Sequence, residues 1–167
     1  EFVGEGIQLT LKDAKERLLK ENGQMIPESG EIKVALLGST PEIEKELFVQ
    51  TVNGYDLSEF NNIMGSKYSL HYLGRKDKPS FLSKAVVPFF FDLYRSETIN
   101  KEQKIFEIKA IKSGLCLGLI TWLRLNLYKD IYFENQPTET CTSGWGNPIY
   151  KLSQPLEINK GDVLKVK

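Results

Sequence analysis

The sequence of 167 residues has little of what many catalytic sites are built from. It contains a single histidine, His71, and two cysteines, Cys116 and Cys141. One imidazole without a patterned nucleophile beside it favours a packing or surface role over a catalytic triad, and no Cys/His spacing fits zinc. Two unpatterned cysteines are expected to be free thiols rather than a disulfide framework. The sequence therefore predicts no metal site.

A surplus of charge of one sign and long hydrophobic runs are also absent. The 22 Lys and Arg residues balance 22 Asp and Glu residues, whereas a surface for nucleic acid or anionic membranes needs a basic surplus. The longest apolar stretch, GLCLGLITWLRLNLY, contains an arginine and an asparagine and is too short to span a bilayer. Since no signal peptide is visible, we expect a cytoplasmic protein that binds neither nucleic acid nor membrane.

Short β-rich runs dominate the second half of the sequence. From residue 81 onward, runs of apolar residues are separated by turn residues at fairly regular spacing, which is typical of antiparallel strands. Alternation over residues 114–128 predicts a strand with one face well buried. Earlier in the chain, Thr10 is a candidate N-cap for a helix over residues 11–22, and residues 39–80 read as short helices and loops. On these residues alone, the predicted fold class is α+β, mainly β, with an N-terminal helix, short helices at 39–80 and many short antiparallel strands that form a barrel or a sandwich.

The chain begins with an acid between two glycines, Gly4-Glu5-Gly6. This is not a phosphate-binding loop, because no strand precedes it and no lysine follows in the required place. On these residues alone, Glu5 reads as a loop acid.

Two stretches carry a resemblance to a known family. VGEGIQLTLKDAKERLLKENGQMIP near the start and SGWGNPIYKLSQPLEINKGDVLKV near the end, with a β-rich stretch between them, resemble the C-terminal half of protein arginine methyltransferases. NGYDLSEFN and FLSKAVVPFFFDL are also similar to that family, so the resemblance covers nearly the whole chain. The resemblance implies an N-terminal Rossmann-like domain that binds S-adenosylmethionine, a β-barrel after it, and a substrate arginine between the two.

The resemblance also implies roles for individual residues. Glu5 matches the second of two glutamates that hold the guanidinium, which makes it the candidate catalytic residue. The first glutamate would precede the chain; another alignment makes Glu1 the first and leaves Thr10 near the second position. Ser143, Gly144 and Trp145 match a Thr-His-Trp loop that closes the site, and are candidate substrate-binding residues. Gly144 departs from the family, whose histidine helps to tie the barrel to the catalytic domain.

The implied domain organisation is incomplete. Residues 1–30 would be the end of the double-glutamate loop and the last helix of the cofactor-binding domain, and residues 31–167 the β-barrel substrate domain with its arm at about 39–80. The sequence has no glycine-rich strand–turn–helix for S-adenosylmethionine, and it stops where the family barrel usually continues. We therefore expect a fragment that is inactive alone and binds no cofactor itself, with a protein or peptide substrate and a possible homodimer through residues 39–80.

Two alternatives remain open. One is a non-catalytic β-sandwich module in which Trp122, Trp145 and Tyr150 form a ligand or carbohydrate platform. The other is a pseudoenzyme scaffold that keeps the fold for protein contacts, which the missing histidine at Gly144 would allow.

Overall fold

The computed structural model describes residues 6–64, 68–71, 79–94, 102–138 and 143–167. It is mostly β, with three helices in the described part of the chain. The elements in chain order are α1 (Ile7–Arg17), β1 (Ser29–Gly38), α2 (Pro41–Leu47), β2 (Thr51–Val52), β3 (Tyr55–Asp56), α3 (Phe60–Met64), β4 (Tyr68–His71), β5 (Ser80–Phe81), β6 (Val86–Asp92), β7 (Phe106–Lys109), β8 (Gly114–Tyr128), β9 (Ile131–Glu134), β10 (Asn147–Ile158) and β11 (Val163–Val166).

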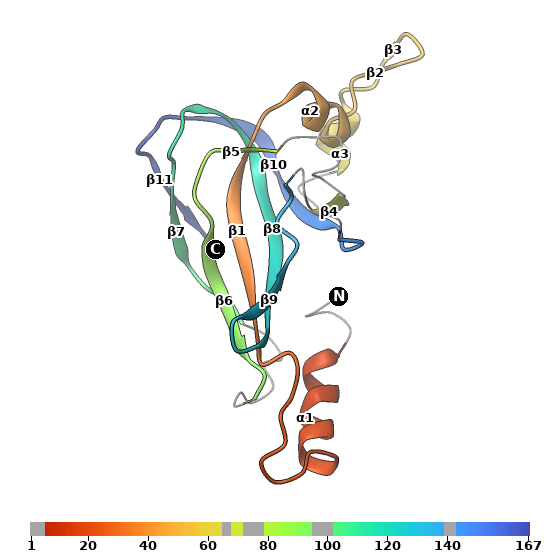
Figure 1. Cartoon of the computed structure of the whole chain (residues 1–167). Helices are drawn as coiled ribbons and strands as arrows, with labels where there is room; N and C mark the ends of the chain where they lie inside the picture. Colours follow the sequence, from red (N-terminus) through yellow and green to blue (C-terminus); the bar gives the residue numbers. More distant parts are fainter. Residues whose placement is uncertain (1–5, 65–67, 72–78, 95–101, 139–142) are drawn as a thin grey trace.

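Two long strands, β1 and β8, form the centre of a curled antiparallel sheet (Figure 1). The strand order is β4-β10-β8-β1-β5, with β6 also paired to β1 and β9 to β8. Strands β7 and β11 form a separate antiparallel pair beside this sheet, joined to it through a bridge between Ser83 and Ala110. The described strands thus confirm the prediction of a mainly β, antiparallel fold, and they form a curled half-barrel.

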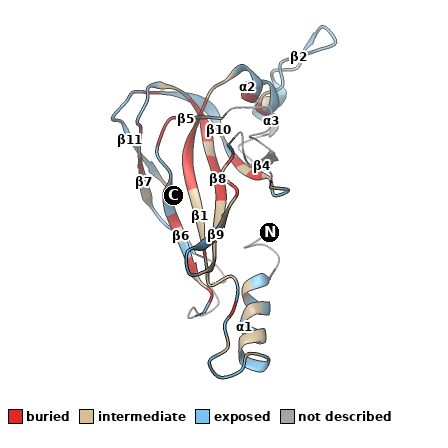
Figure 2. Cartoon of the chain, in the orientation of Figure 1, coloured by how far each residue is buried: buried red, intermediate tan, exposed pale blue. Residues whose placement is uncertain are grey.

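Much of the central strands is buried (Figure 2), and their side chains belong to buried clusters on both faces of the sheet. One face packs against β7 and β11, in a cluster that includes Val34, Leu36 and Ile108. The other face packs under α2, in a cluster that includes Leu37 and Ile43. The central strands are therefore covered on both sides, so the prediction of one buried face for residues 114–128 is wrong.

A bulge in β8 explains why strict alternation fails there. Leu37 of β1 pairs with Gly118, but the next residue, Gly38, pairs with Cys116, so Leu117 has no partner in the ladder. The extra residue exchanges the two faces of the strand: Leu117 packs under α2, whereas Leu119 packs toward β7 and β11. Cys116 is buried and has a free thiol.

Helix α1 begins earlier and ends earlier than the predicted helix over residues 11–22. Gly6 is its N-cap, with a φ of 71°, and the Thr10 hydroxyl donates to the Gly6 carbonyl at 3.2 Å. Thr10 therefore lies inside the helix, where its hydroxyl bonds back to the preceding turn and does not cap the helix. Leu11 packs against a cluster at the lower end of the sheet made by Met25, Phe91, Leu93 and Leu125.

The predicted helical arm contains a hairpin as well as helices. Thr40 caps α2 by accepting from the backbone N–H of Ile43 at 3.3 Å, and Pro41 occupies the first turn, as the sequence predicts. Between α2 and α3, the chain turns at Asn53 and Gly54, both with positive φ, to form β2 and β3. We call residues 41–64 the arm; it projects from one end of the sheet (Figure 1). No helix in the described part of the chain is long and apolar enough to span a membrane.

Candidate functional site

The three predicted substrate-binding residues lie together in a loop directly before β10. We call residues 143–146 the tryptophan loop. Its turn is closed by the backbone N–H of Trp145, which donates to the Ser143 hydroxyl at 3.0 Å. The Trp145 side chain is 47% exposed, and its ring meets the edge of Phe133 in β9 at a centroid distance of 5.5 Å. A half-exposed indole held by one aromatic neighbour keeps part of its surface available to a cation.

A buried asparagine at the end of β9 anchors the loop. Asn135 is 1% exposed and continues the β8–β9 ladder for one step, since its backbone N–H donates to the Leu123 carbonyl at 3.1 Å and its Oδ1 accepts from the Leu123 N–H at 2.8 Å. Its Nδ2 donates to the Trp145 carbonyl at 3.4 Å. Asn147, which is 2% exposed, donates through Nδ2 to the Asn135 carbonyl at 3.0 Å. The two amides connect three strands to the tryptophan loop.

A half-buried ion pair lies beside Asn135, on the opposite face of β9 from Phe133. Glu134 Oε1 accepts from Lys33 Nζ at 2.9 Å and from the indole N–H of Trp122 at 2.8 Å. Burial works to raise the pKa of Glu134, but the hydrogen bonds from Lys33 and Trp122 and the nearby charges of Lys33 and Arg124 outweigh it and hold the pKa below its ordinary value. Glu134 is thus a structural carboxylate that fixes β9 on β1 and β8.

Gly144 lies in open space at the surface. A Cβ placed on it meets no heavy atom within 4 Å, and its φ is outside the left-handed region. The backbone therefore does not require glycine here, and a larger side chain such as histidine would fit beside Trp145.

The predicted catalytic residue, Glu5, lies outside the described residues, which begin at Gly6. The described part of the chain brings no group of three His, Cys, Asp or Glu side chains together in a way that could hold a metal ion. Sequence reasoning missed Asn135, Asn147 and the Lys33–Glu134 pair. The Asn-Gln-Pro and Asn-Pro stretches mark turns, but a turn signal does not predict that the asparagines are buried.

The alternative of an aromatic platform is not supported. Trp122 is 2% exposed, and its indole N–H is already bonded to Glu134. Trp145 and Tyr150 are about half exposed, at 47% and 48%. A carbohydrate platform needs exposed, coplanar rings, so Trp122 cannot belong to one, and the expected set of three is wrong.

Comparison with known proteins confirms the resemblance suggested by the sequence. Over 168 residues the chain is 28% identical to an arginine N(omega)-methyltransferase of Streptomyces achromogenes subsp. streptozoticus, covering 99% of this chain and 45% of that protein, in its C-terminal part. In fold, the chain is similar to a chain of the Trypanosoma brucei PRMT1 enzyme–prozyme heterotetrameric complex with AdoHcy, with a TM-score of 0.77 and 15% identity, covering 96% of this chain and 51% of that one. The chain spans about half the length of both relatives. No protein-family model matches it.

Proposed function

We propose that this chain is the substrate-binding part of an arginine N-methyltransferase. The observation that carries the proposal is the match to an arginine N(omega)-methyltransferase over 99% of the chain. The geometry is consistent with it: the residues that match the family's site-closing loop lie together, and they present a half-exposed indole on a loop that two buried amides hold to the sheet.

In this proposal, Glu5 is half of a carboxylate pair that binds the substrate guanidinium. A guanidinium is a poor nucleophile because its lone pairs are delocalised and its pKa is above about 12. Carboxylates that hold two of its nitrogens concentrate charge there and leave the third nitrogen aimed at the methyl donor, so that alignment supplies much of the rate. The Trp145 indole would form a wall of the same groove and stack on the cation.

The described residues lack the strand arrangement of a Rossmann-like cofactor site. A Rossmann-like site needs a parallel strand followed by a glycine-rich turn and a helix, whereas every strand pairing in the described part of the chain is antiparallel. We propose that another part of the protein binds the cofactor and that this chain contributes the groove wall facing it.

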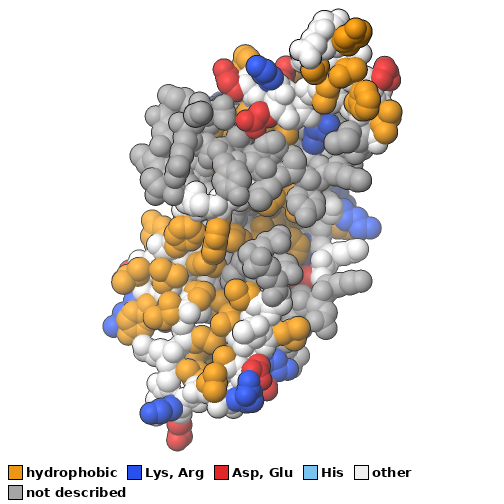
Figure 3. Space-filling view, turned by 90° about the vertical axis from the view of Figure 1, so that its right-hand side faces the viewer, with side chains coloured by type: hydrophobic (Ala, Val, Ile, Leu, Met, Phe, Trp, Pro, Cys, Tyr) orange, Lys and Arg blue, Asp and Glu red, His pale blue; other side chains and the backbone are white. Residues whose placement is uncertain are grey.

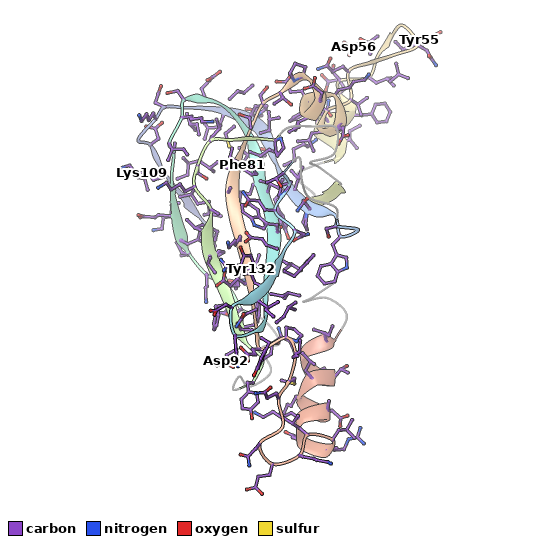
Figure 4. The ribbon with its side chains drawn as sticks, viewed as in Figure 1. Tyr55, Asp56, Phe81, Asp92, Lys109 and Tyr132 are labelled. Atoms are coloured by element: carbon purple, nitrogen blue, oxygen red, sulfur yellow. The ribbon has the colours of Figure 1, made fainter. Side chains whose placement is uncertain are left out.

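We also propose that the protein forms a homodimer through residues 39–80. Five apolar side chains of the arm are exposed: Val49, Val52, Tyr55, Phe60 and Ile63. Apolar side chains gather at the upper end of the molecule, where the arm lies (Figure 3), and Tyr55 lies at its tip, away from the sheet (Figure 4). A contiguous exposed apolar surface is typical of a protein interface, and the fold relative was solved as a heterotetramer.

The central experiment is methyl transfer by the full-length protein from labelled S-adenosylmethionine to an arginine peptide and to the same peptide with lysine in place of arginine. We expect transfer to the arginine peptide only.

Replacing Glu5 by Gln should lower the rate at least tenfold, since a hydrogen bond to a charged group contributes about 1.5–3 kcal/mol, while cofactor binding is unchanged. Glu16→Gln is the matched control, because Glu16 is exposed on α1. Equal transfer to the lysine peptide would overturn arginine specificity, and an unchanged rate for Glu5→Gln would overturn the role of Glu5.

A further inference from the structure

Asn135 lies where the chain leaves the sheet, and its backbone N–H and carbonyl and its side-chain Oδ1 and Nδ2 each make a hydrogen bond. Its backbone N–H and its Oδ1 bond to the carbonyl and the N–H of Leu123, at 3.1 and 2.8 Å. In an antiparallel ladder, both of these bonds would come from backbone groups. Because the side chain supplies the acceptor, the Asn135 carbonyl is free to turn away from β8.

The other two groups of Asn135, its Nδ2 and its backbone carbonyl, bond to the tryptophan loop and to the first residue of β10. Nδ2 donates to the Trp145 carbonyl at 3.4 Å, and the freed Asn135 carbonyl accepts from Asn147 Nδ2 at 3.0 Å. Asn135 and Asn147 are 1% and 2% exposed. A buried amide that loses its partner is costly, so these bonds favour a single arrangement of the two side chains.

The same short segment also fixes the direction of the indole. Phe133, two residues before Asn135, meets the Trp145 ring edge-on at 5.5 Å. Since alternate strand residues lie on the same side, Phe133 and Asn135 act on Trp145 together: Phe133 contacts the ring and Asn135 bonds to the main chain. Glu134 between them is held to the other face by Lys33 and Trp122.

We propose that Asn135 is a positioning residue that, supported by Asn147, fixes the main chain of Trp145 so that its indole forms the wall of the arginine groove. This rests on the proposed function. Asn135 does not contact the substrate; it acts through Trp145. The prediction is therefore a change in substrate affinity without a change in cofactor affinity.

The test uses Asn135→Asp in the full-length protein labelled with 5-fluorotryptophan. Aspartate has the shape of asparagine and keeps the acceptor for Leu123, but its carboxylate cannot donate to the Trp145 carbonyl. We expect the fluorine resonance of Trp145, assigned with Trp145→Phe, to move while that of Trp122 stays. The KM for the arginine peptide should rise at least about threefold, because one hydrogen bond is lost and a buried carboxylate then faces the Trp145 carbonyl, with kcat and the KM for S-adenosylmethionine little changed.

Asn147→Asp is a second variant in case Asn135→Asp does not fold, and it should give the same changes to a smaller extent. The matched control is Asn126→Asp, since Asn126 lies on the same strand as Leu123 but donates to Glu28 at 3.0 Å, away from the tryptophan loop. Asn126→Asp should leave the Trp145 resonance and the peptide KM at their wild-type values.

The outcomes separate this proposal from the proposed function. If the wild-type protein methylates the arginine peptide but the Trp145 resonance does not move in either site variant, the positioning role of Asn135 is wrong. If Trp122 moves as much as Trp145, Asn135 supports the fold in general and the proposal is equally wrong. If the wild-type protein methylates no arginine peptide, the proposed function fails, and the groove role of Asn135 fails with it.

Discussion

In both the arm and the tryptophan loop, asparagine side-chain amides hold the main chain in place. The amide of the arm bonds within the arm, whereas the amides at the tryptophan loop bond it to the sheet. In the arm, Asn61 accepts from the Val49 N–H at 2.9 Å and donates to the carbonyls of Val49 and Ser58 at 2.7 and 2.8 Å. All three bonds stay inside the arm. In the tryptophan loop, Asn135 and Asn147 connect the loop to β8, β9 and β10. The arm holds its own shape, whereas the sheet determines the shape of the loop.

Burial differs in the same way. Among the arm residues whose burial the structure describes, only Ile43 and Leu47 at its root are buried, and there Lys151 of β10 donates to the Leu47 carbonyl at 3.2 Å. Every residue from 49 to 56 is exposed. The loop, in contrast, presents one exposed ring above buried amides. A self-contained arm with an outward apolar surface suits a partner, while a loop continuous with the core suits accurate placement of a side chain. Each of the following predictions tests one side of this difference.

The largest effect is expected from Gly118→Ala in β8. A Cβ at Gly118 would lie 2.3 Å from the Tyr150 carbonyl oxygen of β10, which is too close for a carbon and an oxygen that are not bonded. β8 and β10 would have to separate at Tyr150 and Lys151, so we expect a loss of about 3 kcal/mol or more in the free energy of unfolding, measured by urea denaturation. Gly144→Ala is the control in the loop itself and should change it by less than about 0.5 kcal/mol. Similar values for the two variants would contradict the close packing of β8 on β10 at Gly118.

The next largest effect concerns the arm. Ile63 is 79% exposed, and a glutamate there should raise the dissociation constant of the homodimer at least tenfold, because a charge would be buried at the interface. Sedimentation velocity over a range of concentrations measures this. Ile131→Glu is the matched control, since Ile131 is 63% exposed on β9. A dimer that both substitutions weaken equally would not be formed through the arm.

A smaller effect is expected from Glu134→Gln, on the loop side. The folded-state pKa of Glu134 is lowered, so its carboxylate stabilises the fold above the ordinary glutamate pKa, and this contribution is lost as the pH falls through that value toward the folded pKa. The wild type should exceed Glu134→Gln in unfolding free energy by about 1 kcal/mol at pH 7, with the difference disappearing as the pH falls below the ordinary glutamate pKa of about 4.3. Thermal melts across this range measure it.

Asp13→Asn is the control for that pH dependence. Hydrogen bonding to Arg17 lowers the pKa of Asp13, but this pair is exposed on α1. Surface pairs contribute little, so Asp13→Asn should show a weaker dependence on pH. An equal or stronger dependence than that of Glu134→Gln would mean that the half-buried pair does not fix β9.

The sequence predicted the parts of both regions that depend on local pattern. Thr40 and Pro41 correctly indicated the start of α2, and β-rich runs separated by turn residues located the strands that carry the site. Asn53-Gly54 is a strong hairpin signal, so the hairpin of the arm could have been found. The β8 bulge and the burial of Asn135 could not, since both depend on partners distant in sequence and asparagine is mostly exposed in proteins.

The smallest effect on stability is expected from Gly144→His, which introduces the histidine of the family. No heavy atom lies within 4 Å of a Cβ at Gly144, and its φ suits any residue, so the free energy of unfolding should stay within about 0.5 kcal/mol of the wild-type value. A change in activity would then come through contacts outside the sheet, and we expect kcat/KM for the arginine peptide to rise a few fold in the full-length protein. Unfolding measured by urea and methyl transfer measured side by side separate these effects. A loss of more than about 1 kcal/mol would show that the loop is packed and not open at Gly144. The tryptophan loop would then not combine an exposed surface with buried amides, and it would no longer differ from the arm in this way.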